Sequence, residues 1–237
     1  MLKRCVPNDT TIDNRKRMLI QYQALQPSPG SWYGFEGGNT KTGVSNSIDE
    51  NVLVWNLPPV ACCPGASECL CYCYNADERT DKFPITKWCV NWYWTLYRPQ
   101  ESLILMESRI KSTSNPVIRI HSSGDFYSNE YINLWIKIID NNPQAKFWAY
   151  TRSWRVTDLL PSLEELHSLK NLQLFASADK DSLIPPPRGW RYCLVGTSER
   201  HPNLLNCPEQ YDSNNLSCVN CRICYSNHTE SIYFTMH

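Results

Sequence analysis

Short apolar runs recur along the middle of the chain and are separated by longer stretches with a helical period. The runs at residues 51–55, 116–121, 146–151 and 171–177 are typical of buried strands, and residues 190–197 are a further candidate. Strands that alternate with helices favour parallel βαβ units with right-handed crossovers. We therefore predict an α/β fold whose parallel (β/α) core forms a partial or complete barrel.

The intervening segments carry apolar residues at helical spacing. They predict helices at 84–97, 101–112 and 129–141, and a weaker pattern predicts a short helix at 14–25. Ser162 and Glu165 have the spacing of a capping box, which predicts that a further short helix opens there.

Breaks in this pattern divide the chain into three parts. Residues 1–50 are polar and irregular and are expected to form an N-terminal arm. Residues 51–202 form the (β/α) core, including a first cysteine loop at 62–73. Residues 203–237 are expected to be a loop-like, cysteine-rich metal-binding segment.

Composition adds an argument from charge. The 237 residues contain 23 Lys and Arg and 23 Asp and Glu, so the net charge is zero and no overall field attracts nucleic acid or anionic membrane. No stretch approaches the ~20 apolar residues of a membrane span, and no apolar region follows the N-terminal Met. We expect a cytoplasmic protein without a membrane partner.

Cysteine usage changes the picture most. Twelve cysteines are present, and in a cytoplasmic chain such a number favours metal binding over disulfides. Near the C-terminus, two overlapping C-x-x-C steps follow a more distant cysteine beside Pro208. This spacing predicts one metal centre, with a 4Fe–4S cluster favoured over zinc, and its ligands are Cys207, Cys218, Cys221 and Cys224.

The first cysteine loop follows the first predicted strand. Its best ligand triplet is Cys63, Cys69 and Cys73. Cys62 and Cys71 are then spare thiols, or Cys71 replaces one of its neighbours as a ligand. Three thiolates in such a loop resemble the radical S-adenosylmethionine (radical SAM) arrangement, in which one iron of a 4Fe–4S cluster stays open. The spacing departs from that superfamily, because C-x5-C-x3-C replaces C-x3-C-x2-C. Packed thiols without metal are the alternative.

Polar residues follow the later strands at their carboxyl ends, where parallel sheets bind ligands. The ligand-binding candidates are His121, Asp125, Arg152 and Asp179. They could orient a polar ligand or a metal centre. The alternative is that Asp125 or Ser128 simply caps a helix, and His121 taken alone is more often a packed histidine than a ligand.

Several of these motifs together resemble the phage "gene product 88" family. They are RIHSSGDF at 119–126, FWAYTR at 147–152, the loop from Cys63 to Tyr74, and the C-terminal cysteines. The resemblance spans roughly residues 40 to 225. It implies a protein of phage, plasmid or bacterial type whose layout is similar to the radical SAM barrel; Cys62 and Cys71 are extra to the family pattern.

The expected function is therefore iron–sulfur binding, with one or two 4Fe–4S clusters and SAM as a further candidate ligand. A radical SAM-like enzyme is one hypothesis. A non-catalytic redox or nucleic-acid-associated regulatory factor is the second, and a zinc-stabilised binding module is the third. An unidentified small molecule or nucleic acid is the expected partner, and the sequence leaves open whether the protein is an enzyme.

Overall fold

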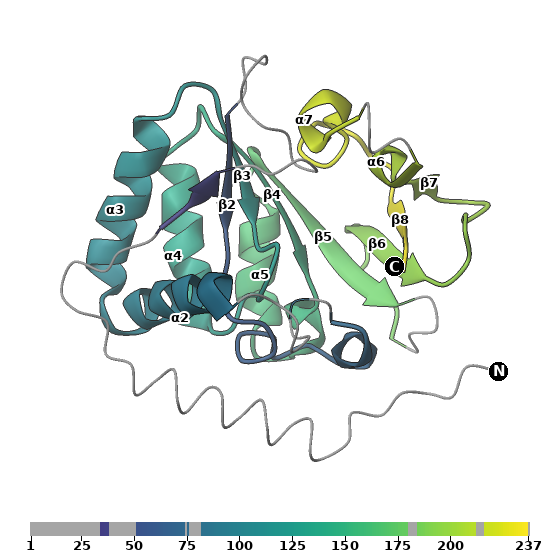
Figure 1. Cartoon of the computed structure of the whole chain (residues 1–237), viewed down its shortest axis with the longest axis horizontal. Helices are drawn as coiled ribbons and strands as arrows, with labels where there is room; N and C mark the ends of the chain where they lie inside the picture. Colours follow the sequence, from purple (N-terminus) through teal and green to yellow (C-terminus); the bar gives the residue numbers. More distant parts are fainter. Residues whose placement is uncertain are drawn as a thin grey trace.

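The part of the chain that the structure describes is built around one sheet of eight strands (Figure 1). The structure is a computed structural model, and it describes residues 34–37, 51–73, 75, 82–179, 184–211 and 216–236. The predicted helix at 14–25 and most of the predicted N-terminal arm lie outside these residues, as do Cys5 and the side chain of Cys71.

The strands follow the spatial order β1-β2-β3-β4-β5-β6-β8-β7. Every pairing from β2 to β7 is parallel, whereas β1 pairs with β2 in the antiparallel sense. The sheet is therefore mixed. The bounds are Glu36–Gly37 (β1), Asn51–Trp55 (β2), Pro116–Ile120 (β3), Lys146–Thr151 (β4), Leu172–Asp179 (β5), Arg191–Gly196 (β6), Leu205–Asn206 (β7) and Ile232–Thr235 (β8).

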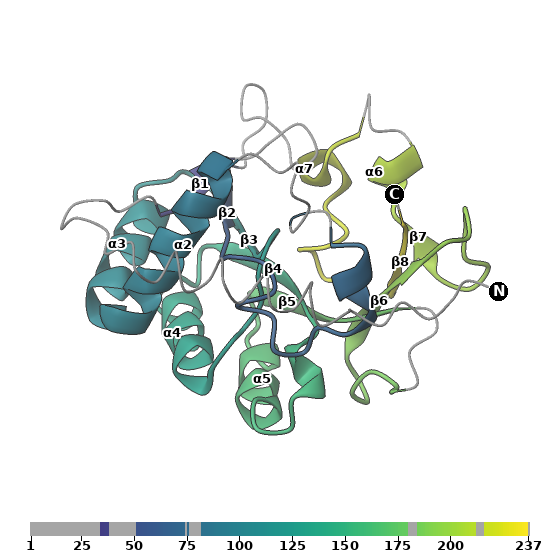
Figure 2. The ribbon, with the colours of Figure 1, turned by 60° about the horizontal axis from the view of Figure 1, so that its bottom comes forward.

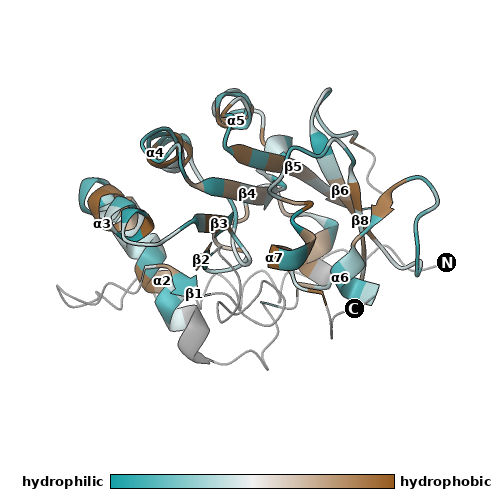
Figure 3. Ribbon diagram, turned by 90° about the horizontal axis from the view of Figure 1, so that it is seen from above, coloured by the Kyte–Doolittle hydropathy of each residue, from teal (hydrophilic) through white to brown (hydrophobic). Residues whose placement is uncertain are grey.

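Helices lie on both sides of this sheet (Figure 3). Seen from above, the sheet curves, with α3, α4 and α5 on its outer side and α6 and α7 on the opposite side (Figure 3). Within the described residues β1 and β7 end the sheet and do not pair with each other. The helices are Lys82–Tyr97 (α2), Pro99–Lys111 (α3), Asn129–Asp140 (α4), Leu160–His167 (α5), Pro208–Tyr211 (α6) and Cys218–Cys221 (α7).

The alternation of side chains along each strand explains the two layers. Trp55, Ile118 and Phe147 belong to the main core, which they share with residues of α3, α4 and α5. Their sequence neighbours Val54 and Val117 face the other way and belong to a smaller cluster with Val219 and Tyr225 of the C-terminal segment. Both faces of the central strands are thus buried, as expected for a parallel sheet.

The strands expected between residues 51 and 197 are present as β2 to β6, and the helices expected at 84–97, 101–112 and 129–141 are present as α2, α3 and α4. Ser128, one of the two alternatives for a helix cap, accepts a hydrogen bond from the Tyr131 amide at 3.2 Å and so caps α4. The radical SAM-like barrel remains a prediction.

The predicted capping box at Ser162 is wrong. Helix α5 begins at Leu160, because Pro161 is well suited to the first turn, and Leu159 at the N-cap makes no side-chain cap. Ser162 lies inside the helix, and its hydroxyl donates to Asn129 Oδ1 at 2.8 Å. The residue joins α5 to the start of α4 instead of opening the helix.

Two segments that the sequence pattern placed outside the sheet contribute strands to it. The C-terminal segment was expected to be loop-like, but it contains β7, α6, α7 and β8, and β8 lies between β6 and β7. At the other end, β1 belongs to the predicted arm. The Asn91 side chain of α2 holds this strand by hydrogen bonds with both the amide and the carbonyl of Gly34, each at 3.1 Å. Among the described residues, no helix has the length and apolar character needed to cross a membrane.

Candidate metal centres

The four C-terminal cysteines line a single pocket. Cys207 directly follows β7, Cys218 and Cys221 are the first and last residues of α7, and Cys224 follows three residues later. The Cys207 amide donates to the Tyr233 carbonyl of β8 at 3.0 Å, which places this cysteine at the edge of the sheet. The rest of the pocket wall is formed by Leu205, Pro208, Glu209, Ile223 and Ile232.

A tight turn brings Cys224 back toward the other three cysteines. Arg222 ends α7 with a left-handed backbone (φ 61°), and its amide donates to the Cys218 carbonyl at 2.8 Å. Tyr225 then folds under α7 and donates its hydroxyl to the Val219 carbonyl at 3.1 Å. Both Val219 and Tyr225 pack on the sheet, so the cysteine turn is anchored to the core.

The thiols of this C-terminal set influence one another. Burial is the largest cause that raises the pKa of Cys224 to about 12, and the neighbouring Cys218, Cys207 and Cys221 raise it further. The Tyr150 hydroxyl donates a hydrogen bond to Cys224 Sγ at 2.8 Å, which acts in the opposite direction. A metal that binds here must displace the protons of the thiols.

The donor chemistry fits a thiolate-bound metal centre, because four sulfur ligands in one partly apolar pocket suit either an iron–sulfur cluster or zinc. In the described part of the chain, however, no group of three or more His, Cys, Asp or Glu side chains has an arrangement that could hold a metal ion. Metal binding is therefore a proposal.

The second cysteine set lies at the carboxyl ends of the parallel strands. Cys63, Cys69 and Cys73 are near enough for electrostatic effects between their thiols. Burial raises the pKa of Cys63, and the Asp125 carboxylate raises it further. Burial also raises the pKa of Cys69, which lies near both Arg152 and Asp179. We call these three cysteines the mouth set.

A buried ion pair stands beside the mouth set. Arg152, after β4, donates two hydrogen bonds to the Asp179 carboxylate at the end of β5, at 2.6 and 2.8 Å. Tyr72 of the cysteine loop donates its hydroxyl to Asp179 and accepts a hydrogen bond from Arg152 at 3.0 Å. The pair therefore fixes the loop close to Cys73, while its own charges are satisfied within the chain.

The two remaining ligand-binding candidates are also engaged inside the protein. Asp125 accepts hydrogen bonds from the Thr151 hydroxyl at 2.6 Å and from the amides of Arg152 and Phe126 at 2.8 and 2.7 Å. His121 is buried, and its Nε2 lies 2.8 Å from the Tyr131 hydroxyl. Burial lowers the pKa of His121 to about 3, so the ring is neutral. This geometry agrees with the packed-histidine alternative.

Close backbone contacts hold the cysteine loop on the sheet. A Cβ atom at Gly65 would lie 2.0 Å from the Arg152 carbonyl oxygen. Arg155 pairs with Glu68 at 3.2 Å, and hydrogen bonds from Ser67 and Arg155 lower the pKa of Glu68 to about 2. In Figure 2 the dark blue turn of this loop lies next to β5 and β6.

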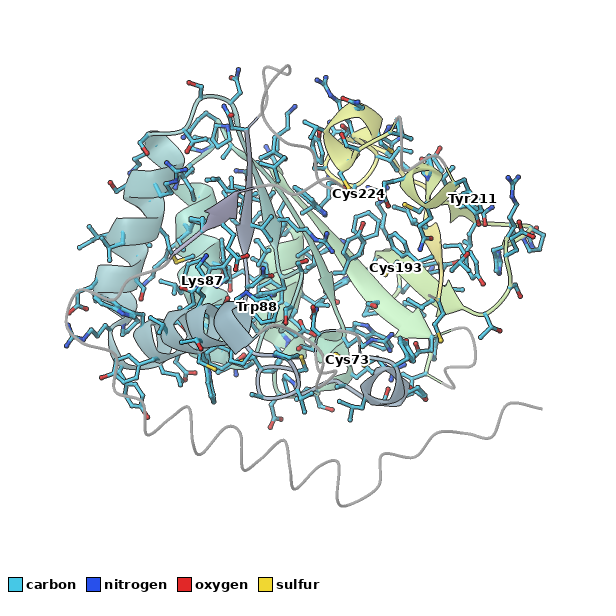
Figure 4. All side chains as sticks on the ribbon, in the orientation of Figure 1. Cys73, Lys87, Trp88, Cys193, Tyr211 and Cys224 are labelled. Carbon is cyan, nitrogen blue, oxygen red and sulfur yellow. The ribbon has the colours of Figure 1, made fainter. Side chains whose placement is uncertain are left out.

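The structure also places the cysteines that the sequence left unassigned. Cys62 is fully buried in the main core, and Cys89 is buried on α2. Cys193 is buried in a cluster with Phe175, Cys207 and Ile232. In the view of Figure 4, Cys224 lies toward the upper end of the sheet and Cys73 toward the lower end, and Cys193 lies between these two levels. The two candidate metal sets are therefore separate sites.

Sequence patterns did not reveal the side-chain contacts that connect these sets to the sheet. Tyr150 touches Cys224 across a sequence separation of 74 residues, and Tyr72 touches Asp179 across 107. The only sequence signal for Tyr150 is its position two residues before Arg152, which assigns both to one face of β4 without showing what either one meets.

The chain is similar to known proteins over most of its length. The family model described as "Gene product 88" matches residues 33–231. The "Gene 88 protein" of Mycobacterium phage L5 is 26% identical over an alignment of 229 residues, and the match covers 84% of this chain and 91% of that protein. The protein of the same name from Mycobacterium phage D29 is 26% identical over 230 residues, with the same coverage.

No solved structure matches the chain. The family match covers the strands β2 to β7, the mouth set and all four C-terminal cysteines, and it agrees with the resemblance seen in the sequence motifs. The chain therefore belongs to the gene product 88 family.

Proposed function

We propose that this protein is an iron–sulfur protein whose C-terminal cysteines bind a 4Fe–4S cluster. The observation that carries the proposal is the pocket lined by Cys207, Cys218, Cys221 and Cys224, which come from separate turns of the segment after β6. Four thiolates complete the ligand set of such a cluster, and a bound cluster supplies one-electron chemistry. Zinc is the rival occupant, because it also accepts four thiolates.

The mouth set supports a second cluster with a different character. Cys63, Cys69 and Cys73 provide three thiolates, and the fourth position would be open to a ligand such as SAM. The Arg152–Asp179 pair and Asp125 make their hydrogen bonds within the chain. Their role in this proposal is thus to position the cysteine loop, and any direct contact with a ligand is secondary.

Catalysis depends on whether that open position binds SAM. A protein that binds SAM at the mouth set is a radical SAM-like enzyme or a close relative of one. A protein that binds clusters but does not bind SAM is a redox or nucleic-acid-associated regulatory factor. Three thiols beside buried charges support a radical SAM-like enzyme more than they support a purely structural module.

The C-terminal centre is tested by replacing Cys221 with Ser in anaerobically purified protein. We expect the variant to lose bound iron and sulfide and to melt at a lower temperature, because metal binding contributes to the folding free energy. Cys89→Ala is the matched control, since Cys89 is buried but belongs to neither set. Iron content and melting temperature equal to the wild type would refute the proposal, and zinc in place of iron would establish the rival.

The mouth set is tested separately with Cys63→Ser, Cys69→Ser and Cys73→Ser. Each variant is expected to lose part of the iron while the C-terminal centre keeps its share. Addition of SAM to the reduced wild-type protein should change the electron paramagnetic resonance spectrum of the mouth cluster only. If all three variants retain the full iron content, the mouth set holds no cluster.

A further inference from the structure

Tyr150 on β4 reaches the C-terminal cysteine pocket through a hydrogen bond to sulfur. Its hydroxyl lies 2.8 Å from Cys224 Sγ. The ring is fixed by Phe175, with ring centres 5.0 Å apart, and by Phe234, with ring centres 5.6 Å apart in an edge-to-face contact. The direction of the hydroxyl is therefore set by packing before any metal binds.

Arg119 brings a positive charge to the same place. It pairs in register with Trp148 on β4, two residues before Tyr150, so both side chains lie on the sheet face that the C-terminal segment covers. The charge of Arg119 acts on the Tyr150 hydroxyl. The Nε atom of Arg119 is buried and makes no hydrogen bond. A buried polar group of this kind needs an explanation, and a negatively charged centre bound through Cys224, the sulfur that Tyr150 contacts, would supply one.

We infer that Tyr150 is a positioning residue of the C-terminal centre: it holds Cys224 as a metal-bound thiolate and, together with the charge of Arg119, raises the reduction potential of the bound cluster. The inference rests on the proposed metal binding. A hydrogen bond to a ligand sulfur withdraws negative charge from the cluster, and a nearby cation favours the more negative, reduced state. Both effects make the cluster easier to reduce.

The test uses Tyr150→Phe in the full chain, with two measurements. Release of iron to a chelator is expected to be about tenfold faster than in the wild type, since a hydrogen bond to a charged ligand is lost. The midpoint potential of the C-terminal cluster is expected to fall. Arg119→Met should lower the potential as well but leave the Tyr150 hydrogen bond in place.

Tyr225→Phe is the matched control, because its hydroxyl donates a hydrogen bond to the Val219 backbone carbonyl beside the same turn. It should keep the wild-type potential. The inference alone would be overturned if Tyr150→Phe and the wild type had equal midpoint potentials and equal iron-release rates. An equal fall in the potential of the Tyr225→Phe control would overturn it as well. A wild-type chain that binds no metal overturns the proposed function and the inference with it.

Discussion

The fold holds His121 in a protonation state that its position in the sequence does not reveal. It follows β3 with a left-handed backbone (φ 69°), an unusual conformation for a residue other than glycine. Its ring packs edge-on against Phe126, with ring centres 4.8 Å apart, and its Nδ1 is buried without a hydrogen-bond partner. The residue is held neutral because protonation would bury an unpaired charge.

This burial predicts that the protein becomes less stable as the pH is lowered. The pKa of His121 is about 3 in the folded chain and about 6.5 in the unfolded chain, so between these values the unfolded state binds the extra proton. The unfolding free energy should therefore decrease as pH falls from about 6.5 toward 3, by up to about 1.4 kcal/mol per pH unit. Below pH 3 both states are protonated, and the contribution is gone.

The measurement compares urea unfolding of the wild type and His121→Asn across this pH range. Asparagine tolerates the left-handed backbone and does not titrate, so the variant should be less dependent on pH even if it is less stable overall. Identical pH slopes in the two proteins would show that His121 is not held neutral.

Among the elements, the first cysteine loop depends on contact with the end of β4. Gly65 lies so close to the Arg152 carbonyl that no larger residue fits without movement of the backbone. The same region carries the Tyr72 contacts with Asp179 and Arg152. The loop and the strand end therefore form one unit, and the positions of Cys63, Cys69 and Cys73 depend on it.

Gly65→Ala tests this dependence. The added Cβ would overlap the Arg152 carbonyl, so the loop must shift, and we expect a loss of about 1–3 kcal/mol in unfolding free energy. Iron bound at the mouth set should fall, while iron at the C-terminal centre stays. Gly37→Ala is the control, because nothing lies within 4 Å of its Cβ position. A variant with wild-type stability and full iron content would show that the contact does not position the loop.

At the scale of the whole molecule, the C-terminal segment completes the sheet and also carries a candidate metal centre. β8 pairs with β6 on one side and β7 on the other, and Cys207 follows β7 directly. A metal shared by Cys207 and Cys224 would join β7 to the turn after α7. Metal and strand pairing are therefore expected to stabilise the same segment.

Removal of the metal should loosen this segment selectively. After chelation, amide hydrogen exchange is expected to rise at Cys207 and Leu205, whose amides donate to the Tyr233 and Ser231 carbonyls. The amides of β3 and β4, buried under α4, should keep their protection. Uniform loss of protection across the sheet, or no change at Cys207, would contradict this division.

Local pattern in the sequence was sufficient to predict the strands β2 to β6 and the helices α2, α3 and α4, because buried strands and amphipathic helices have characteristic periods. It also grouped the cysteines into two sets, since ligand spacing is a local property of the chain. It did not predict β1, β7 or β8, which are short and lack a clear period.

Tertiary structure alone decided which distant side chains meet. The Tyr150 hydrogen bond to Cys224 and the Tyr72 hydrogen bond to Asp179 depend on the parallel order of the strands and on the packing of two distant segments of the chain against the sheet. Such contacts follow from register and from long-range packing, which leave no periodic trace in the residues themselves. Sequence therefore determined which cysteines are candidate metal ligands, and the fold determined which side chains lie beside them.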